Sequence, residues 1–568
     1  MSKIVIYQVF PRYFGNIGKN PVCEGTIDQN GCGKLNDFSL KAFQSIRDLG
    51  VSHVWFTGIL EHATKTDYSV YGIAKDHPAV VKGKAGSPYA IKDYYDVDPD
   101  LAVNPVNRLA EFKEMLKRCH QSGLKAIIDF VPNHVARQYH SDACPEGTRD
   151  FGSDDHVNQS FNPDNNFYYL PGQKLHPGID LYAGSEKPYV EFPAKVTGND
   201  CFNAYPGIND WYETVKLNYG VDYQGGGRCY FQNVPATWFK MLDVLSYWTK
   251  IGVDGFRCDM AEMVPVEFWE WSIHRIRKLN PDILFIAEIY KPGQYHDYLQ
   301  RGGFDYLYDK MGMYDTVRLI VEGYGPTSSI TGCWQSVNVI QSKMLYFFEN
   351  HDEQRLASDF FAKDPVKGFP ALIVLACMQT NPFMLYSGQE LGETGMYSEG
   401  YSATDGRSTI FDYWTIDSLA AWNNSGKWNE QNLTDLQKHV RSYYKRVLHL
   451  CMEEKSFSDG LFFDLMYAND VNPDFNSSRL YAFLRKAGNE FVLVVANFSD
   501  ESIHFSLNIP RHAFDCLAIP DDHTWLATDL MTEETIQVVL SSARSLFLDA
   551  PANSGLLLKC TINEMSDK

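Results

Sequence analysis

The stretch Val253-Asp-Gly-Phe-Arg-Cys-Asp259 is followed, after a helical pattern over Val266–Leu279, by Ile283-Leu-Phe-Ile-Ala-Glu288. We predict strands at Val253–Arg257 and Ile283–Glu288, and a carboxylate, Asp259 or Glu288, stands at the end of each segment. A strand, helix, strand order predicts a parallel βαβ unit, whose strands are buried on both faces and read as continuous apolar runs. The stretch therefore indicates an α/β fold.

The same alternation extends over roughly the first 450 residues, as expected for successive βαβ units. Further strands are predicted at Ile4–Phe10, His53–Ile59, Leu124–Val131, Phe304–Tyr306, Met344–Glu349 and Phe383–Tyr386. Further helices are predicted at Leu40–Leu49, Arg108–Ser122, Thr237–Ile251, Thr316–Glu322 and Pro365–Gln379. Eight strand signals favour a closed (β/α)8 TIM barrel over an open doubly wound sheet. No GxGxxG or GxxxxGK[ST] motif follows the first strand, which argues against dinucleotide and P-loop folds.

Two regions interrupt the alternation. Residues 135–227 are rich in Asn, Asp, Gly, Pro and Tyr without a sustained helical period, and they are too many for a structureless loop. We expect them to form a small inserted domain after the third strand. From residue 456 the pattern changes to alternating strands, which predicts a C-terminal antiparallel β-sandwich over 456–568. The barrel is then expected to consist of 1–134 and 228–455.

The composition restricts the partners. The 568 residues contain 51 Lys and Arg and 71 Asp and Glu, a formal net charge of −20. Such a surface repels phosphate backbones and anionic lipid, so we expect no nucleic-acid partner and no membrane partner. The first residues show no basic region followed by an apolar core and cleavage site, so we expect a cytoplasmic protein with reduced cysteines. These patterns do not fix an oligomeric state.

Three carboxylates end predicted strands and are the candidate catalytic residues: Asp259, Glu288 and Asp352, the last in Phe347-Phe-Glu-Asn-His-Asp352. In a barrel of parallel strands the carboxyl ends meet at one face, where the active site lies. Arg257 precedes Asp259 by two residues, and His351 is next to Asp352. A charge at the end of a buried strand is costly unless it is paired or used, so this set predicts a catalytic site.

Six segments in this order resemble the conserved segments of the α-amylase family, glycoside hydrolase family 13. They are Asp129-Phe-Val-Pro-Asn-His134, Lys216-Leu-Asn218, Gly255-Phe-Arg-Cys-Asp259, Ala287-Glu288, Asn350-His-Asp352 and Asn381-Pro-Phe-Met-Leu-Tyr-Ser-Gly-Gln-Glu390. The resemblance covers nearly the whole chain. It implies that the insert corresponds to the family's domain B and the terminal sandwich to its domain C.

The resemblance implies retaining glycoside hydrolysis. Asp259 would attack the anomeric carbon, and Glu288 would first protonate the leaving oxygen and then deprotonate water. Asp352 would bind sugar hydroxyls and stabilise the distorted transition state. No cofactor is then required for the chemistry.

The resemblance also implies substrate-binding residues: Tyr89 as a platform for the sugar ring, His134, Arg257 and His351 beside the carboxylates, and Arg355 as a further contact. For Arg355 a surface salt bridge is an alternative. Many exo-acting α-glucosidases carry an Asp in the position after the tyrosine, where this chain has Ala90. That difference favours an open cleft and internal cleavage.

Calcium is the metal that the resemblance suggests. Many α-amylases bind a domain-bridging calcium through an asparagine, matched here by Asn133, and through a histidine, matched here by Met263. A second candidate is the loop Asp28-Gln-Asn-Gly-Cys-Gly-Lys-Leu-Asn36, where Asp28, Asn30 and Asn36 offer oxygen ligands but little negative charge. A glycine turn capped by Asp and Asn is the alternative for this loop.

The function expected from these segments is hydrolysis of α-1,4-glucosidic bonds in α-glucans or maltooligosaccharides. A glucanotransferase, an α-glucosidase and an α-1,6-acting enzyme stay open as alternatives, because loop shape chooses the acceptor and the linkage. A non-catalytic glucan-binding module is the alternative from a different class, since a barrel alone does not prescribe a function.

Overall fold

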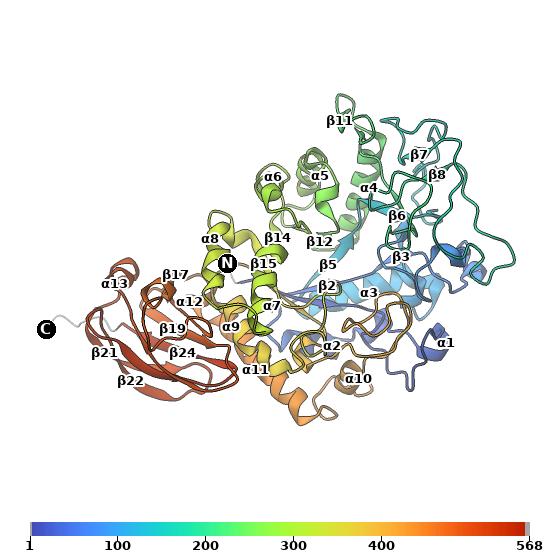
Figure 1. Cartoon of the computed structure of the whole chain (residues 1–568). Coiled ribbons are helices and arrows are strands. Elements are labelled where there is room, and N and C mark those ends of the chain that lie inside the picture. Colours follow the sequence, from blue (N-terminus) through green and yellow to red (C-terminus); the bar gives the residue numbers. More distant parts are fainter. Residues whose placement is uncertain (1–2, 563–568) are drawn as a thin grey trace.

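The computed structural model describes residues 3–562, and its centre is a closed barrel of eight parallel strands (Figure 1). Around the barrel these are β1 (Val5–Val9), β2 (His53–Phe56), β5 (Lys125–Phe130), β12 (Gly255–Cys258), β13 (Leu284–Ala287), β14 (Tyr306–Tyr308), β15 (Met344–Phe347) and β16 (Phe383–Tyr386). Ile6 of β1 pairs with His53 on one side and with Met384 on the other, which closes the ring. The predicted TIM barrel is confirmed.

Large side chains fill the barrel interior. One buried cluster contains residues from seven strands and one following turn: Ile6, Trp55, Ile127, Ile286, Tyr308, Tyr314, Leu345, Phe347 and Met384. Layers of bulky residues from successive strands are what a TIM barrel needs for a solid core. The catalytic face must therefore lie above this plug, at the carboxyl ends of the strands.

Helices surround the barrel (Figure 1). They are α2 (Leu40–Arg47), α3 (Arg108–Gln121), α4 (Ala236–Ile251), α5 (Val266–Leu279), α6 (Tyr295–Gln300), α7 (Asp315–Val321), α8 (Ser329–Ser336), α9 (Phe369–Cys377), α10 (Asp417–Asn423) and α11 (Asp435–Glu453). The short α1 (Ile27–Asn30) precedes them. The predicted range of α5 matches its bounds, because its apolar positions recur at helical spacing between Pro265 and Asn280.

The prediction for the sixth strand was wrong by two residues. The strand is Tyr306–Tyr308 rather than Phe304–Tyr306. Phe304 is buried outside the barrel sheet, where its ring packs against Trp269 and Tyr298. An apolar residue that joins two helices to the barrel resembles a strand residue in the sequence, so periodicity alone misplaced the strand.

The long connection after β2 contains an antiparallel hairpin that the sequence analysis did not predict. Its strands are β3 (Leu60–His62) and β4 (Ile91–Val97), and their pairing is irregular around Glu61. All seven residues of β4 are buried, although three of them are charged. Its second strand, β4, begins two residues after Tyr89 and contacts β6, the first strand of the inserted region.

The inserted region has short strand pairs and no helix among its described residues. These strands are β6 (His134–Ala136), β7 (Tyr169–Leu170), β8 (Ala194–Lys195), β9 (Thr214–Lys216), β10 (Val221–Asp222) and β11 (Arg228–Cys229). The expected boundary after 134 falls at the start of β6, which pairs with β9. The boundary after 227 separates β10 from its partner β11, so the paired strands continue to Cys229.

The C-terminal region forms antiparallel sheets beside the barrel, at the end opposite the insert (Figure 1). One sheet has the order β17 (Leu461–Asp464), β18 (Leu480–Ala487), β19 (Glu490–Asn497), β24 (Ser554–Thr561), β21 (His523–Asp529) and β22 (Thr535–Leu540), and a second pairs β20 (Ile503–Leu507) with β23 (Leu546–Ala550). Helices α12 (Lys455–Ser458) and α13 (Arg511–Leu517) accompany them. The predicted antiparallel domain is confirmed.

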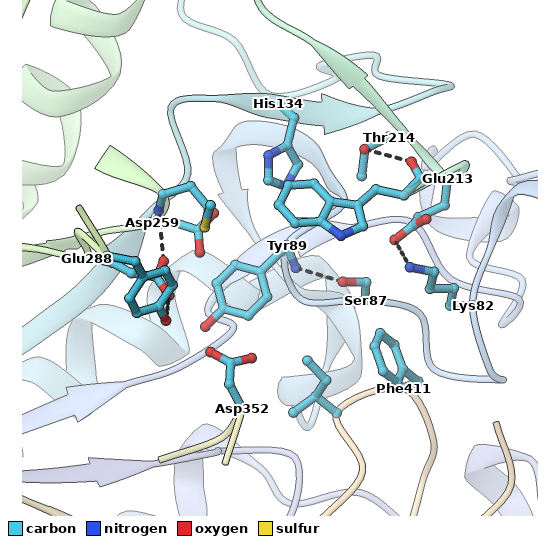
Figure 2. Close-up of a pocket in the computed structure, with 14 residues that line it drawn as sticks. Lys82, Ser87, Tyr89, His134, Glu213, Thr214, Asp259, Glu288, Asp352 and Phe411 are labelled. Carbon is cyan, nitrogen blue, oxygen red and sulfur yellow. Dashed lines mark hydrogen bonds and ion pairs between the residues drawn. The ribbon is translucent and has the colours of Figure 1, made fainter. Parts of the chain in front are cut away.

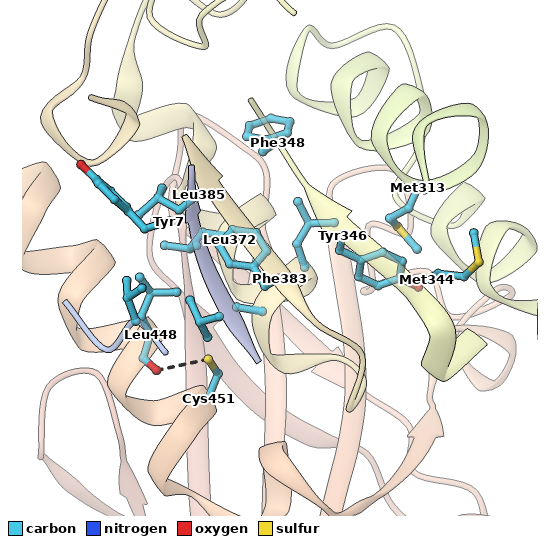
Figure 3. Packing of buried hydrophobic residues seen from close by; sticks show 14 of the residues in the cluster. Tyr7, Met313, Met344, Tyr346, Phe348, Leu372, Phe383, Leu385, Leu448 and Cys451 are labelled. Atoms are coloured by element: carbon cyan, nitrogen blue, oxygen red, sulfur yellow. Dashed lines mark hydrogen bonds between the residues drawn. The ribbon is translucent and has the colours of Figure 1, made fainter. Parts of the chain in front are cut away.

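Helix α9 joins the barrel to this domain. Every residue of α9 is buried, and the helix contacts β15, β19, β24 and α11. Figure 3 shows Leu372 of α9 beside Phe383 and Leu385 of β16, with Leu448 of α11 nearby. The longest apolar run of the sequence, Phe369–Met378, thus forms this enclosed helix except for its last residue. No helix within residues 3–562 has the length and apolar character needed to cross a membrane, and none of the twelve cysteines, all inside this range, forms a disulfide.

Candidate active site

The three predicted catalytic acids line one pocket, as Figure 2 shows. Asp259 directly follows β12, Glu288 directly follows β13, and Asp352 lies in the loop after β15. The parallel strands bring these loops to the same end of the barrel. Tyr89 and His134 line the same pocket, so the structure brings together five residues that the sequence analysis singled out.

Arg257 connects the first two acids. Its Nη1 donates a hydrogen bond to Asp259 Oδ1 at 2.7 Å, and its Nη2 lies 2.8 Å from Glu288 Oε2. The guanidinium is buried, and its Cζ lies 5.2 to 5.5 Å from the ring centroids of Trp55, Tyr89 and Tyr308. One guanidinium thus makes a hydrogen bond to Asp259 and an ion pair with Glu288, so both carboxylates lie beside the same buried positive charge.

The environments of the two acids differ. Burial raises the pKa of Asp259, and its ion pair with Arg257 opposes that rise. Burial also raises the pKa of Glu288, where Arg257 again opposes the rise but the negative charge of Asp259 adds to it. Two carboxylates whose pKa values are raised by different sets of neighbours are suited to different roles.

The backbone just after Asp259 is shaped to reach Glu288. Met260 has a φ of 43°, in the left-handed region that residues other than glycine adopt rarely. This turn directs the Met260 N–H to Glu288 Oε2 at 2.8 Å, while the Tyr290 hydroxyl donates to Glu288 Oε1 at 2.6 Å. The two hydrogen bonds therefore hold the Glu288 carboxylate in one orientation.

Asp352 is the most open of the three acids, with 42% of its side chain exposed in the pocket. His351 Nε2 lies 3.1 Å from Asp352 Oδ2 and 2.5 Å from the Tyr89 hydroxyl. Gln8 Nε2 donates to His351 Nδ1 at 2.8 Å, so the ring proton is on Nε2. Burial and then Arg257 lower the pKa of His351 far below its usual value, which keeps the ring neutral.

His134 is held at the opposite wall. Burial lowers its pKa to about 3, so this ring is also neutral, and it lies 5.2 Å from the ring centroid of Trp211. Gly198 comes so close that an added Cβ would lie 2.9 Å from the His134 Cβ. The insert can therefore approach His134 only because residue 198 has no side chain.

Asn133, the first calcium candidate, does not fit a calcium ligand in this chain. Its Oδ1 accepts a hydrogen bond from Lys216 Nζ at 2.9 Å, and the same ammonium is 2.6 Å from Asp200 Oδ1. Lys216 is buried, with 2% of its side chain exposed. A cation of the protein itself thus occupies the position between these oxygens, where a metal ion would be repelled.

The loop candidates do not converge as ligands either. Asn30 is buried and uses its side chain internally: it accepts from the Val22 N–H and donates to the carbonyl groups of Val22 and Tyr413. Asp28 and Asn36 are exposed on separate elements. The Asn30 contacts hold the turn together from inside, and the alternative of a glycine turn capped by Asp28 and Asn36 stays a prediction.

One expectation about substrate contact needs correction. Arg355 is buried away from the pocket wall, where it pairs with Glu349 Oε2 at 3.0 Å and donates to Ser408 and to the Ser387 carbonyl. Although Arg355 is only three residues after Asp352, its side chain points into the protein instead of into the pocket. Ala90 is buried in a small apolar cluster, and the internal cleavage expected from the absence of an Asp at this position stays a prediction.

The pocket contains residues that the sequence analysis missed. Lys82 and Glu213 form an ion pair of 2.8 Å, and Phe411 lies near them in Figure 2. Trp211 also lines the pocket. These residues come from three separate segments without a recognisable motif. Asp129 begins the segment Asp129–His134, which the sequence analysis quoted without giving this residue a role. Its carboxylate accepts a hydrogen bond from Trp55 Nε1 at 3.1 Å.

A closed (β/α)8 barrel whose carboxyl-terminal face holds two acids on one guanidinium defines a class of barrel enzymes that use paired carboxylates. The family model described as alpha amylase, catalytic domain, matches residues 8–446. The match spans more than half of the chain, so the protein belongs to the α-amylase family of glycoside hydrolases.

Individual relatives are distant. Alpha-amylase MalA of Haloarcula japonica is 23% identical over 399 residues, which cover 69% of this chain and 44% of that protein. Neopullulanase 2 of Thermoactinomyces vulgaris is 21% identical over 551 residues, which cover 92% of this chain and 74% of that protein. The chain spans 44% of the length of MalA and 50% of an α-amylase from Streptomyces lividans. The maltogenic α-amylase AmyB of Thermotoga neapolitana has the same fold, with a TM-score of 0.62, 19% identity and 99% of both chains covered.

Proposed function

We propose that this protein is a retaining glycoside hydrolase that cleaves α-1,4-glucosidic bonds of maltooligosaccharides or α-glucans. The observation that carries the proposal is the contact of Asp259 and Glu288 with the two ends of the Arg257 guanidinium. A retaining enzyme needs its carboxyl groups about 5–5.5 Å apart, whereas an inverting enzyme separates them by about 6.5–9.5 Å to admit water. Two acids on one guanidinium favour the shorter arrangement.

The roles follow from the charges. Asp259 acts as the nucleophile, because Arg257 favours its ionised form and its carboxylate faces the pocket. Glu288 keeps its proton longer, because burial and Asp259 both raise its pKa, and so it acts as general acid and then as general base. Asp352, next to neutral His351, holds sugar hydroxyls. The reaction uses side chains only and needs no cofactor.

The aromatic walls suit a glucose unit. Tyr89 stacks on His351 with ring centroids 5.2 Å apart, which leaves its other face to the pocket, and Trp211 lies beside His134. The apolar face of a pyranose can bury area against such rings while its hydroxyls bind Asp352 and the histidines. These contacts support an α-glucan substrate over a small apolar one.

Cleavage near a chain end is a second candidate. The Lys82–Glu213 pair links the insert to the connection between β3 and β4, and Lys82 Nζ also lies 5.8 Å from the centroid of the Phe411 ring. Figure 2 shows these groups on the side of Tyr89 away from Glu288. Glu288 protonates the leaving group, so the part of the sugar chain that is transferred to the enzyme lies on the side of Tyr89 away from Glu288. There the wall formed by Lys82, Glu213 and Phe411 limits the number of sugar units. Short products would result.

The replacement Glu288→Gln tests the role of the acid. It keeps the shape of the side chain but cannot exchange a proton, so turnover of maltoheptaose should fall by about 10²–10⁴-fold while sugar binding persists. Glu353→Gln is the control, because Glu353 binds Tyr314 and Lys310 instead of the pocket. Unchanged turnover in the Glu288→Gln enzyme would refute the assignment.

Products from maltoheptaose, separated by chromatography at early and late times, test the specificity. Mixed shorter oligosaccharides at early times indicate internal hydrolysis, and glucose or maltose alone indicates cleavage at a chain end. Products longer than the substrate indicate a glucanotransferase. NMR of the first product tests the stereochemistry: retention requires the α-anomer to appear first. The β-anomer would refute the proposed nucleophile.

A further inference from the structure

Three carboxylates converge outside the catalytic pocket. Glu61 lies on β3, Asp96 lies on β4, and Asp142 lies in the first segment of the insert. Oxygen atoms of the three side chains are all within 4.8 Å of one another. Glu61 is 1% exposed and Asp96 is 5% exposed, whereas the Asp142 side chain is 22% exposed and opens the cluster to solvent.

Glu61 lacks a partner. Within residues 3–562, neither of its carboxylate oxygens has a hydrogen-bond partner, and no lysine or arginine forms an ion pair with it. The β3–β4 pairing shifts register on both sides of Glu61, which turns this residue out of a regular ladder. A buried carboxylate without a partner is strongly unfavourable, so a ligand or a proton must compensate it.

A fourth carboxylate stands beside the three. Asp93 pairs with Glu61 across the hairpin, which adds negative charge next to the cluster. The Asp93 oxygens are already taken, because they accept from the Ser141 hydroxyl and from the N–H groups of Tyr95, Asp142 and Ala143. Asp93 therefore increases the charge around Glu61 without offering it a partner.

The surroundings are short of positive charge. Arg108 lies 2.5 Å from an oxygen of Asp96 and 3.9 Å from one of Asp142. Lys92, on the same strand as Asp96, directs its ammonium elsewhere, 3.0 Å from Asp76 Oδ2. Among the described residues, the Arg108 guanidinium thus pairs with Asp96 and Asp142 but leaves the Glu61 carboxylate without a cationic partner.

We propose that Glu61, Asp96 and Asp142 bind a divalent cation, with calcium preferred. The donors are oxygen atoms only, which suits a hard cation, and calcium accepts six to eight oxygens in an adaptable geometry. The partly exposed side of Asp142 admits the waters that complete the coordination. The ion would fasten the beginning of the insert to the hairpin whose second strand follows Tyr89.

The competing explanation is a proton. Burial, followed by the charges of Asp142 and Asp93, raises the pKa of Glu61 to about 9. Without a cation the group is therefore a neutral carboxylic acid at pH 7. Glu61→Gln separates the two explanations, since glutamine imitates the protonated acid but is a much poorer cation ligand.

The test uses the full chain, freed of metal with chelator. Isothermal titration with CaCl2 should show one saturable site per chain, and Tm should rise with calcium concentration until that site is full. Glu61→Gln and the partly exposed Asp142→Asn should each weaken binding at least tenfold and abolish the rise in Tm. Glu146→Gln, an exposed acid near Asp142 in the chain, is the matched control and should bind like the wild type.

Two results would overturn the proposal. One is the absence of saturable binding and of any Tm change with Ca²⁺, Mg²⁺ or Mn²⁺ at millimolar concentration, together with a Glu61→Gln protein as stable as the wild type. The other is calcium binding that both variants retain, which would place the ion elsewhere. Asp142→Asn keeps the test decisive if Glu61→Gln fails to fold, because Asp142 is not in the core.

Discussion

The hydrogen bond from Tyr290 lowers the pKa of Glu288, and the replacement Tyr290→Phe measures the size of this effect. The Tyr290 hydroxyl donates to Glu288 Oε1 at 2.6 Å, and this bond lowers the pKa of Glu288 against the rise caused by burial. A hydrogen bond to a charged group contributes about 1.5–3 kcal/mol. Since one pKa unit corresponds to about 1.36 kcal/mol, losing the bond should raise the pKa of Glu288 by about 1–2 units.

The assay is the pH dependence of kcat/KM for maltoheptaose. Loss of the Glu288 proton sets the basic limb of this profile, and the limb reports the free enzyme. Because Tyr290 stabilises the ionised form, Tyr290→Phe should move the basic limb to higher pH by about 1–2 units. The acidic limb, set by Asp259, should move much less.

Tyr295→Phe is the matched control. Tyr295 is buried nearby on α6, and its hydroxyl has no hydrogen-bond partner within residues 3–562. The control should therefore leave the basic limb in place. A basic limb that stays fixed in Tyr290→Phe, moves to lower pH, or moves equally in both variants would refute the reasoning.

Three further replacements test the surroundings of the site. Arg355→Met leaves Glu349 buried and unpaired, so the free energy of unfolding should fall by about 3–5 kcal/mol. A stable variant with a raised KM would instead make Arg355 a substrate contact. His134 has a pKa of about 3 when folded, so its contribution to stability is complete above its usual 6.5 and is lost as the pH falls toward 3. Urea unfolding at pH 6.5 and 4.5 should show less pH dependence in His134→Asn, by up to about 1.4 kcal/mol per pH unit, and an equal slope would contradict this. Lys216→Met removes the donor to Asn133 Oδ1 and should cost about 1–3 kcal/mol in thermal unfolding; an unchanged Tm would argue against the buried pair.

The barrel could be predicted because its strands carry a local signal. Runs such as Ile283–Glu288 are apolar at nearly every position, since parallel strands in a barrel are buried on both faces. The same regularity predicts that Asp259, Glu288 and Asp352 lie together, because the carboxyl ends of parallel strands share one face. The hairpin of β3 and β4 was missed, since its buried charged residues break the apolar alternation.

The partners of each side chain depended on tertiary structure. Asn133 looked like a metal ligand in the sequence, but Lys216, 83 positions away, places its ammonium on the same oxygen. The residues around Arg355 in the sequence do not decide whether its side chain faces a sugar or the protein. Its ion pair with buried Glu349 holds the side chain inside the protein. Trp211 and Lys82 reach the pocket from segments without periodicity. Burial of the backbone is encoded by neighbours in sequence, whereas the pairing of polar atoms depends on which distant segments meet.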